Sequence, residues 1–170
     1  VLKETGGRLW HTSTVSRIAE QFGRAVHSIN AQSAPPDCLR NAVNNFFYRD
    51  PMYLPPSAPD DQLSSEPHSF SRVFTAGFFE AMSAMLQIVA HKPKEDDLLA
   101  VARDAGALIS KAAQTAALSA AFYSEMAAQV IWADTISSGP DKSRVPPEWK
   151  AAFARLGEEP IVKRLQMQRA

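Results

Sequence analysis

The sequence holds one cysteine, Cys38, and only 7 glycines among its 170 residues. A single cysteine excludes an internal disulfide and any zinc site that needs several thiolates. Long apolar runs are also missing, because Arg72, Glu80 and Gln87 interrupt the richest stretch well short of the roughly 20 residues that a membrane-spanning helix needs. With 45% hydrophobic residues, the chain is still apolar enough to bury a core. The composition therefore predicts a soluble globular domain.

Net charge is absent as well, since 18 Lys and Arg residues balance 18 Asp and Glu residues. A nucleic-acid-binding domain built on a broad basic face needs many cations to neutralise phosphates. We therefore expect neither a nucleic-acid partner nor a membrane partner. No charged segment followed by an apolar one opens the chain, so no signal peptide is predicted and the compartment stays open.

No alternating strand pattern is visible, whereas alanine, the strongest helix former, is abundant in the second half of the chain. The sequence predicts an all-α fold of five or six helices around a central buried helix. We expect one helical domain over residues 1–157, followed by a tail over 158–170.

Apolar residues at helical spacing and local stop signals predict the individual helices. The most apolar one, with only a thin polar stripe of Arg72, Glu80 and Gln87, is expected to be the central and most buried helix. The predicted helices span residues 13–29, 37–43, 69–90, 95–117 and 120–136, with a last one between Pro147 and Gly157.

The segment 35–67 contains 7 of the 12 prolines and is predicted to be an ordered loop with a short helix. Its aromatic and apolar residues, such as Phe46 and Tyr53, provide anchors for packing. Because long ordered loops in compact domains are usually functional, this loop is the segment expected to border a site.

The sequence contains few candidates for catalytic or metal-binding residues. The histidines at positions 11, 27, 68 and 91 include no pair three or four residues apart, and no HExxH motif is present. Cys38 is expected to be a small packing residue rather than a nucleophile. His68 stands where the loop meets the central helix, and unpaired N–H groups at a helix start favour an oxyanion. The alternative is that His68 or Ser69 merely caps this helix.

Three short segments resemble the helical C-terminal domain of thermolysin-like and fungalysin-like zinc metallopeptidases. The run from Glu66 to Phe79 resembles the His-x-x-Ser segment of that family, with His68 and Ser71 at the matching positions. Cys38-Leu39-Arg40-Asn41 resembles its Leu-Arg segment, and Arg40 precedes His68 by 28 residues. The run from Trp149 to Gly157 resembles its closing helix. The resemblance thus extends from about Leu39 to Gly157.

The resemblance implies that His68 donates a hydrogen bond to the oxyanion formed when water attacks a peptide carbonyl. Arg40 would bind a carbonyl of the substrate backbone. An aspartate orients the imidazole in the family, but that position is Leu63 here, so Glu66 or Asp61 would have to substitute. Ser71 is expected to cap or pack rather than to react.

The zinc ligands of that family are missing from the 170 residues. The resemblance therefore implies that zinc belongs to an N-terminal half of a longer parent protein, which would be the partner of this chain. The chain alone would hold no cofactor and be inactive, while the full enzyme would act on peptide or protein substrates. A non-catalytic helical interaction or scaffold domain remains the alternative, with a carrier of a small apolar ligand as a third possibility.

Overall fold

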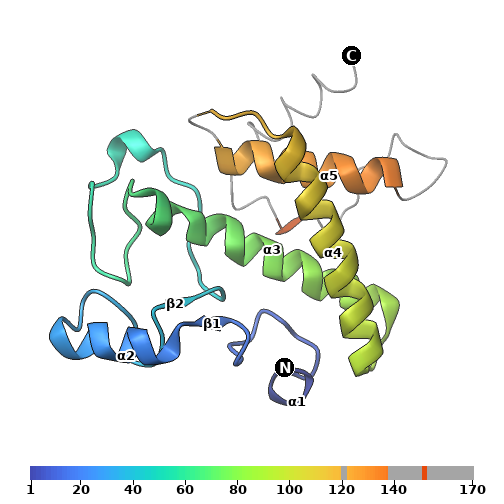
Figure 1. The fold of residues 1–170 in the computed structure, drawn as a ribbon, viewed down its shortest axis with the longest axis horizontal. Helices are drawn as coiled ribbons and strands as arrows, with labels where there is room; N and C mark the ends of the chain where they lie inside the picture. The colour runs from blue at the N-terminus through green and yellow to red at the C-terminus, as the bar shows by residue number, and fades with distance from the viewer. Residues whose placement is uncertain (120–121, 138–150, 153–170) are drawn as a thin grey trace.

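The computed structural model describes residues 1–119, 122–137 and 151–152 and confirms an all-α fold. Three long helices dominate it: α3 (Pro67–Val89), α4 (Glu95–Thr115) and α5 (Phe122–Ser137). Helix α3 runs through the middle, α4 crosses its C-terminal end, and α5 packs on both (Figure 1). Shorter elements complete the described part of the chain: α1 (Leu2–Thr5), β1 (Arg17–Ile18), α2 (Glu20–Ile29), β2 (Arg40–Asn41) and the 3-10 turn η1 (Pro51–Tyr53).

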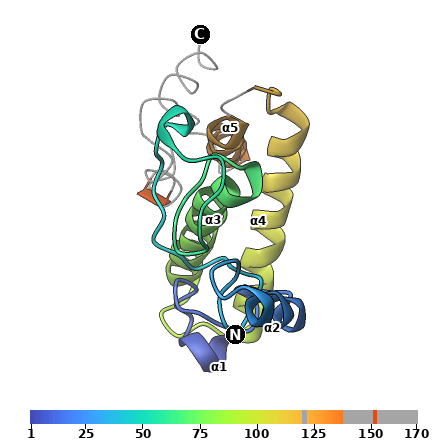
Figure 2. The same ribbon diagram turned by 90° about the vertical axis from the view of Figure 1, so that its left-hand side faces the viewer.

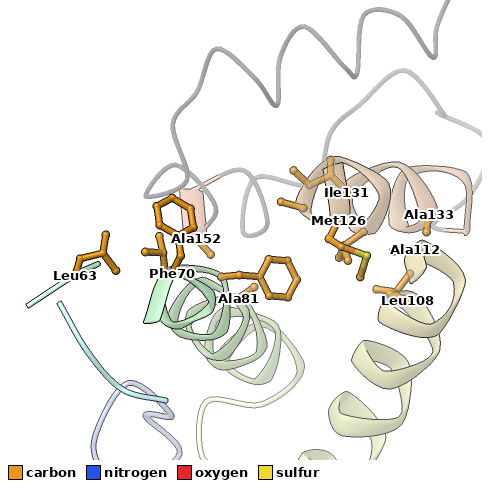
Figure 3. Packing of buried hydrophobic residues seen from close by; sticks show 13 residues of the cluster. Leu63, Phe70, Ala81, Leu108, Ala112, Met126, Ile131, Ala133 and Ala152 are labelled. Atoms are coloured by element: carbon orange, nitrogen blue, oxygen red, sulfur yellow. The ribbon is translucent and has the colours of Figure 1, made fainter. Parts of the chain in front are cut away.

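The main core lies where α3, α4 and α5 meet (Figure 3). Val73 and Phe74 of α3 belong to this cluster together with Val130 and Ile131 of α5, and Ala152 joins it from the described residues 151–152. The apolar spacing predicted that Val73, Phe74 and Val130 lie in the core, but Ile131 was not among the residues expected to face inward. The remainder of the predicted last helix, 147–150 and 153–157, and the predicted tail 158–170 lie outside the described residues.

Helix α3 is central, but the prediction that it is the most buried helix was wrong. Ten of its 23 residues are buried, against nine of 16 in α5. Ile88 and Val89, at the end of α3, are exposed although they belong to its apolar surface. Burial along α3 continues as far as Leu86, and the three residues that follow it in the helix are exposed.

The N-terminal segment differs most from prediction. A helix over 13–29 was expected, but residues 13–16 form a turn in which the Ser16 hydroxyl accepts a bond from the Ser13 amide at 2.9 Å. Serine bonds to nearby backbone compete with helix formation. Ala19 then adopts a left-handed conformation with φ of 52°, so α2 begins only at Glu20.

The short helix expected over 37–43 is also absent. Arg40 and Asn41 instead form β2, which pairs antiparallel with β1 through Ile18↔Arg40 and Arg17↔Asn41. Pairing between segments distant in the sequence overrides local helix signals. This two-stranded ladder fixes Arg40 within the proline-rich segment 35–67, which runs from the end of the molecule near α2 toward the end near α5 (Figure 2).

Helix α2 packs against residues 38–39 through Gly23 rather than through its apolar face. Gly23 is its buried residue and lies against the backbone of Cys38 and Leu39. Phe22 and Ile29, on the apolar face, are 60% and 88% exposed.

Because a Cβ at position 23 would overlap the Cys38 carbonyl group, we expect Gly23→Ala to destabilise the protein by about 1–3 kcal/mol. Gly106, inside α4, is the matched control, since a Cβ added there would meet nothing within 4 Å. Gly106→Ala should stabilise by about 0.5–1 kcal/mol through helix propensity. Urea unfolding of both variants measures the difference, and equal effects would contradict the close approach of α2 to β2.

Candidate functional site

The proline-rich loop borders a small polar pocket of about 100 Å³. Its walls come from the loop itself, from the first turn of α3 and from β2. Two arginines, two carboxylates and four serines line it: Arg40, Arg72, Asp60, Glu66, Ser33, Ser57, Ser64 and Ser69.

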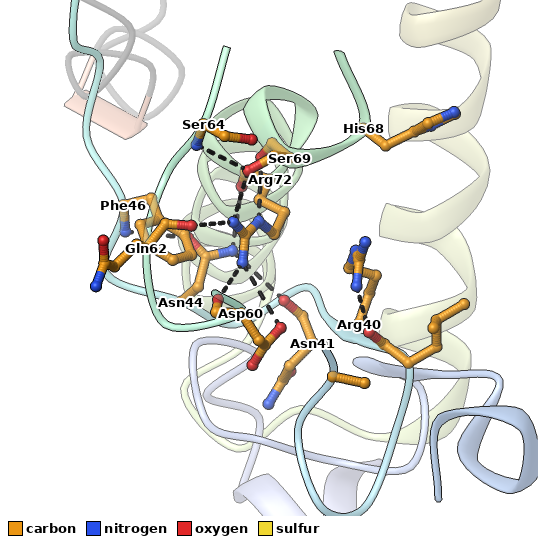
Figure 4. A network of polar contacts seen from close by, with 12 residues as sticks. Arg40, Asn41, Asn44, Phe46, Asp60, Gln62, Ser64, His68, Ser69 and Arg72 are labelled. Carbon is orange, nitrogen blue, oxygen red and sulfur yellow. Dashed lines mark hydrogen bonds and ion pairs between the residues drawn. The ribbon is translucent and has the colours of Figure 1, made fainter. Parts of the chain in front are cut away.

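Arg72 forms the densest polar network beside this pocket (Figure 4). Only 9% of the residue is exposed. Its guanidinium donates to the backbone carbonyls of Asp60 and Gln62, the latter at 2.6 Å, and to the Ser69 hydroxyl at 2.7 Å. A further bond from Nε reaches the Ser69 carbonyl at 3.0 Å. These bonds tie residues 60–62 of the loop to the first turn of α3.

Aromatic and amide side chains complete the surroundings of Arg72. Its guanidinium lies over the ring of Phe46 at 4.2 Å, a cation–π contact. Asn44 donates from Nδ2 to the Arg72 carbonyl at 3.1 Å. Helical spacing placed Arg72 on the thin polar stripe of α3, and the structure shows that Arg72 is buried there because the loop residues Asp60 and Gln62 bond to it.

Burial shifts the pKa values of Asp60 and Arg72, which form an ion pair in this network. Desolvation raises the pKa of Asp60 above its ordinary value, and the charges of Arg72 and Arg40 oppose the shift. Desolvation likewise lowers the pKa of Arg72, with Asp60 opposing it. The Arg72 Nη1 and Asp60 Oδ1 atoms are 3.8 Å apart, so the ion pair is looser than the carbonyl bonds.

The predicted site residues lie around the same end of α3. Arg40 is half-buried in β2 and lines the pocket, where its Nη1 donates to the Leu39 carbonyl at 2.9 Å. His68 is exposed in the first turn of α3, and its imidazole points away from the Arg72 network (Figure 4). Its imidazole has no hydrogen bond to a described residue, and its backbone carbonyl accepts the Ser71 hydroxyl at 2.8 Å. That bond fits the packing role expected for Ser71.

The cap of α3 is Glu66, not His68 or Ser69. The Glu66 carboxylate accepts the Ser69 amide at 2.9 Å, and Pro67 occupies the first helical position. Asp61 is exposed. Among the described residues, neither carboxylate bonds the imidazole of His68. Leu63, at the position of the family's aspartate, is buried in the main core.

Cys38 is fully buried, as predicted. Desolvation, reinforced by Asp37, raises the pKa of its thiol to about 11. The thiol therefore stays protonated at neutral pH and is a packing group rather than a nucleophile.

Within residues 1–119, 122–137 and 151–152, no three His, Cys, Asp or Glu side chains gather closely enough to hold a metal ion. In the same part of the chain, every helix is too short or too polar to cross a membrane.

No protein-family model, curated protein or solved structure matches this chain. The assignment of function therefore depends on its own residues.

Proposed function

We propose that this chain is the helical C-terminal domain of a thermolysin-like or fungalysin-like zinc metallopeptidase. The observation that supports the proposal best is the position of Arg40 and His68, which are separated by 28 residues and lie near the same end of α3. Glu66, two residues before His68, lines the pocket together with Arg40. The half-buried Arg40 and the exposed His68 are both accessible to a substrate at this end of α3.

The two residues have complementary roles in this proposal. The Arg40 guanidinium is permanently charged and donates in a fixed fork, which suits binding of a backbone carbonyl. His68 donates to the oxyanion that develops on the scissile carbonyl, so its bond strengthens in the transition state. The fold supports this assignment of His68, because no bond to a described residue occupies its imidazole.

The zinc ion would be held by the HExxH half of the parent protein and would lower the pKa of the attacking water. The described residues of this chain contain no ligand set for it. The chain's own contribution is one wall of the cleft, and the chain alone is expected to be inactive. Retention of stoichiometric zinc by the isolated chain after dialysis against a weak chelator would contradict this.

Orientation of the imidazole departs from the family pattern. Glu66 already accepts the Ser69 amide as the cap of α3, and Leu63 is apolar. Asp61 is the remaining candidate within this loop, and it would have to approach His68 when substrate is bound.

A non-catalytic helical interaction domain is the second candidate. The exposed apolar face of α2, with Phe22 and Ile29, favours it, because such faces are normally covered by a partner. Finding an HExxH motif upstream in the parent gene would favour the peptidase, and its absence would favour the interaction domain.

In the full-length parent, we expect His68→Ala to lower kcat/KM for a peptide substrate by about a hundredfold, the usual effect of removing one oxyanion donor. Because His68 is exposed, the melting temperature should change little. His91→Ala, which also removes an exposed histidine, is the control and should leave both quantities unchanged. Unaltered kcat/KM in His68→Ala would disprove the assignment.

A further inference from the structure

The pocket beside Arg40 holds hydrogen-bond donors that the fold leaves available. The Arg40 guanidinium makes one bond, from Nη1 to the carbonyl of its neighbour Leu39, and no other to the described part of the chain. The hydroxyl groups of Ser33, Ser57 and Ser64 line the same pocket. A guanidinium fork with neighbouring hydroxyls is suited to an oxygen-rich ligand.

Three of the four charged groups in the walls already have bonded partners. Arg72 and Asp60 form an ion pair, and Arg72 also binds the Asp60 carbonyl. The Glu66 carboxylate faces the positive end of α3 and accepts the Ser69 amide at 2.9 Å. Asp61 is exposed, so water screens its charge. The four charged groups of the walls therefore balance, and Arg40 is the one whose hydrogen-bond donors remain largely unused.

We propose that this pocket binds a carboxylate, either the C-terminal carboxylate of a peptide or the side chain of an acidic residue. A carboxylate is planar and accepts two parallel N–H bonds, which matches the guanidinium fork of Arg40. A doubly charged phosphate would meet the Asp60 and Glu66 carboxylates in the same walls. A pocket of about 100 Å³ holds a small group rather than a whole ligand.

This inference goes beyond the carbonyl-binding role proposed above, because it concerns a charged group and a pocket with its own donors. It does not depend on a zinc-binding half. Binding to the 170-residue chain alone tests the carboxylate site. A failure of this test would leave the proposed peptidase function to be tested by the His68→Ala experiment.

The experiment is a titration followed by NMR of the backbone amides of Ser57 and Ser64 and of the Nε–H group of Arg40. Four probes separate the ligand classes: acetyl-Gly-Gly for a terminal carboxylate, acetyl-Asp-amide for a side-chain carboxylate, acetyl-Gly-amide as the neutral control, and inorganic phosphate. We expect saturable shifts with the two carboxylates and none with the neutral amide. The tighter carboxylate identifies the source of the ligand, and either order supports the site.

Two variants test the pocket from different sides. Arg40→Met should weaken carboxylate binding at least tenfold, because it removes the charge and the fork. Ala58→Asp, which adds a carboxylate to the pocket lining, should weaken binding similarly while leaving Arg40 in place. Arg24→Met, at an exposed position of α2 outside the pocket lining, is the control and should bind like the original chain.

Three results would overturn the proposal. They are unchanged affinity in a folded Arg40→Met or Ala58→Asp variant, equal binding of the neutral amide, and tighter binding of phosphate than of both carboxylates. Circular dichroism of each variant establishes that it is folded, and Ala58→Asp decides the question if Arg40→Met does not fold.

Discussion

Replacing Arg72 by methionine should destabilise the protein by about 3–5 kcal/mol, the usual cost of removing one partner from a buried charged network. Methionine fills a similar volume but cannot donate to Asp60, Gln62 and Ser69. The buried Ser69 hydroxyl would lose a partner, and the Asp60 and Gln62 carbonyls would lose the bonds that hold the loop to α3. Urea unfolding at neutral pH measures this loss.

Arg72→Lys separates the geometry of the network from its charge. One ammonium group cannot reach the two loop carbonyls and the Ser69 hydroxyl as the guanidinium does, so lysine should recover less than half of the lost stability. Arg103→Met, on the exposed side of α4, is the matched control and should change stability by less than about 0.5 kcal/mol. Full recovery by lysine would mean that charge alone holds the loop.

Phe74→Ala is the second substitution with a large expected effect, a loss of about 3–5 kcal/mol, the range for emptying a buried aromatic site. Phe74 lies in the main core and its ring is 6.3 Å from that of Phe78 and 6.1 Å from that of Tyr123. Its removal would open a cavity between α3 and α5 that neither helix can close. Denaturant unfolding, with the slope compared between variants, measures the effect.

Phe22→Ala is the control for Phe74→Ala, because the same atoms are removed from a side chain that is 60% exposed on α2. It should cost less than about 1 kcal/mol. A loss below about 1 kcal/mol for Phe74→Ala itself would show that Phe74 is not part of the core and that α3 is misplaced.

The three long helices follow from local properties of the sequence. The apolar spacing of α3, α4 and α5, the alanines of α4 and α5 and the acidic first turn of α4 all favour the same structure. Burial of Cys38 was also predicted, because a lone cysteine has the packing properties of a small apolar residue.

Signals in the N-terminal half were weaker, since segments 13–18 and 37–43 have both helical spacing and residues that bond their own backbone. The pairing of Ile18 with Arg40 selected strands instead of helices in these segments. This pairing joins residues far apart in the chain, so the local sequence does not predict it. Gly23 had no distinguishing pattern around it, yet its missing side chain determines where α2 docks.

The sequence by itself thus determined the helical class and the three core helices, whereas the roles of Arg40 and His68 that it suggests stay a prediction. Only the tertiary structure decided that Arg72 is buried, that Glu66 caps α3 and that Arg40 lines a polar pocket. The physical reason is that helical spacing predicts which side chains share a face. Whether that face meets solvent, another helix or a folded loop depends on contacts between residues far apart in the chain.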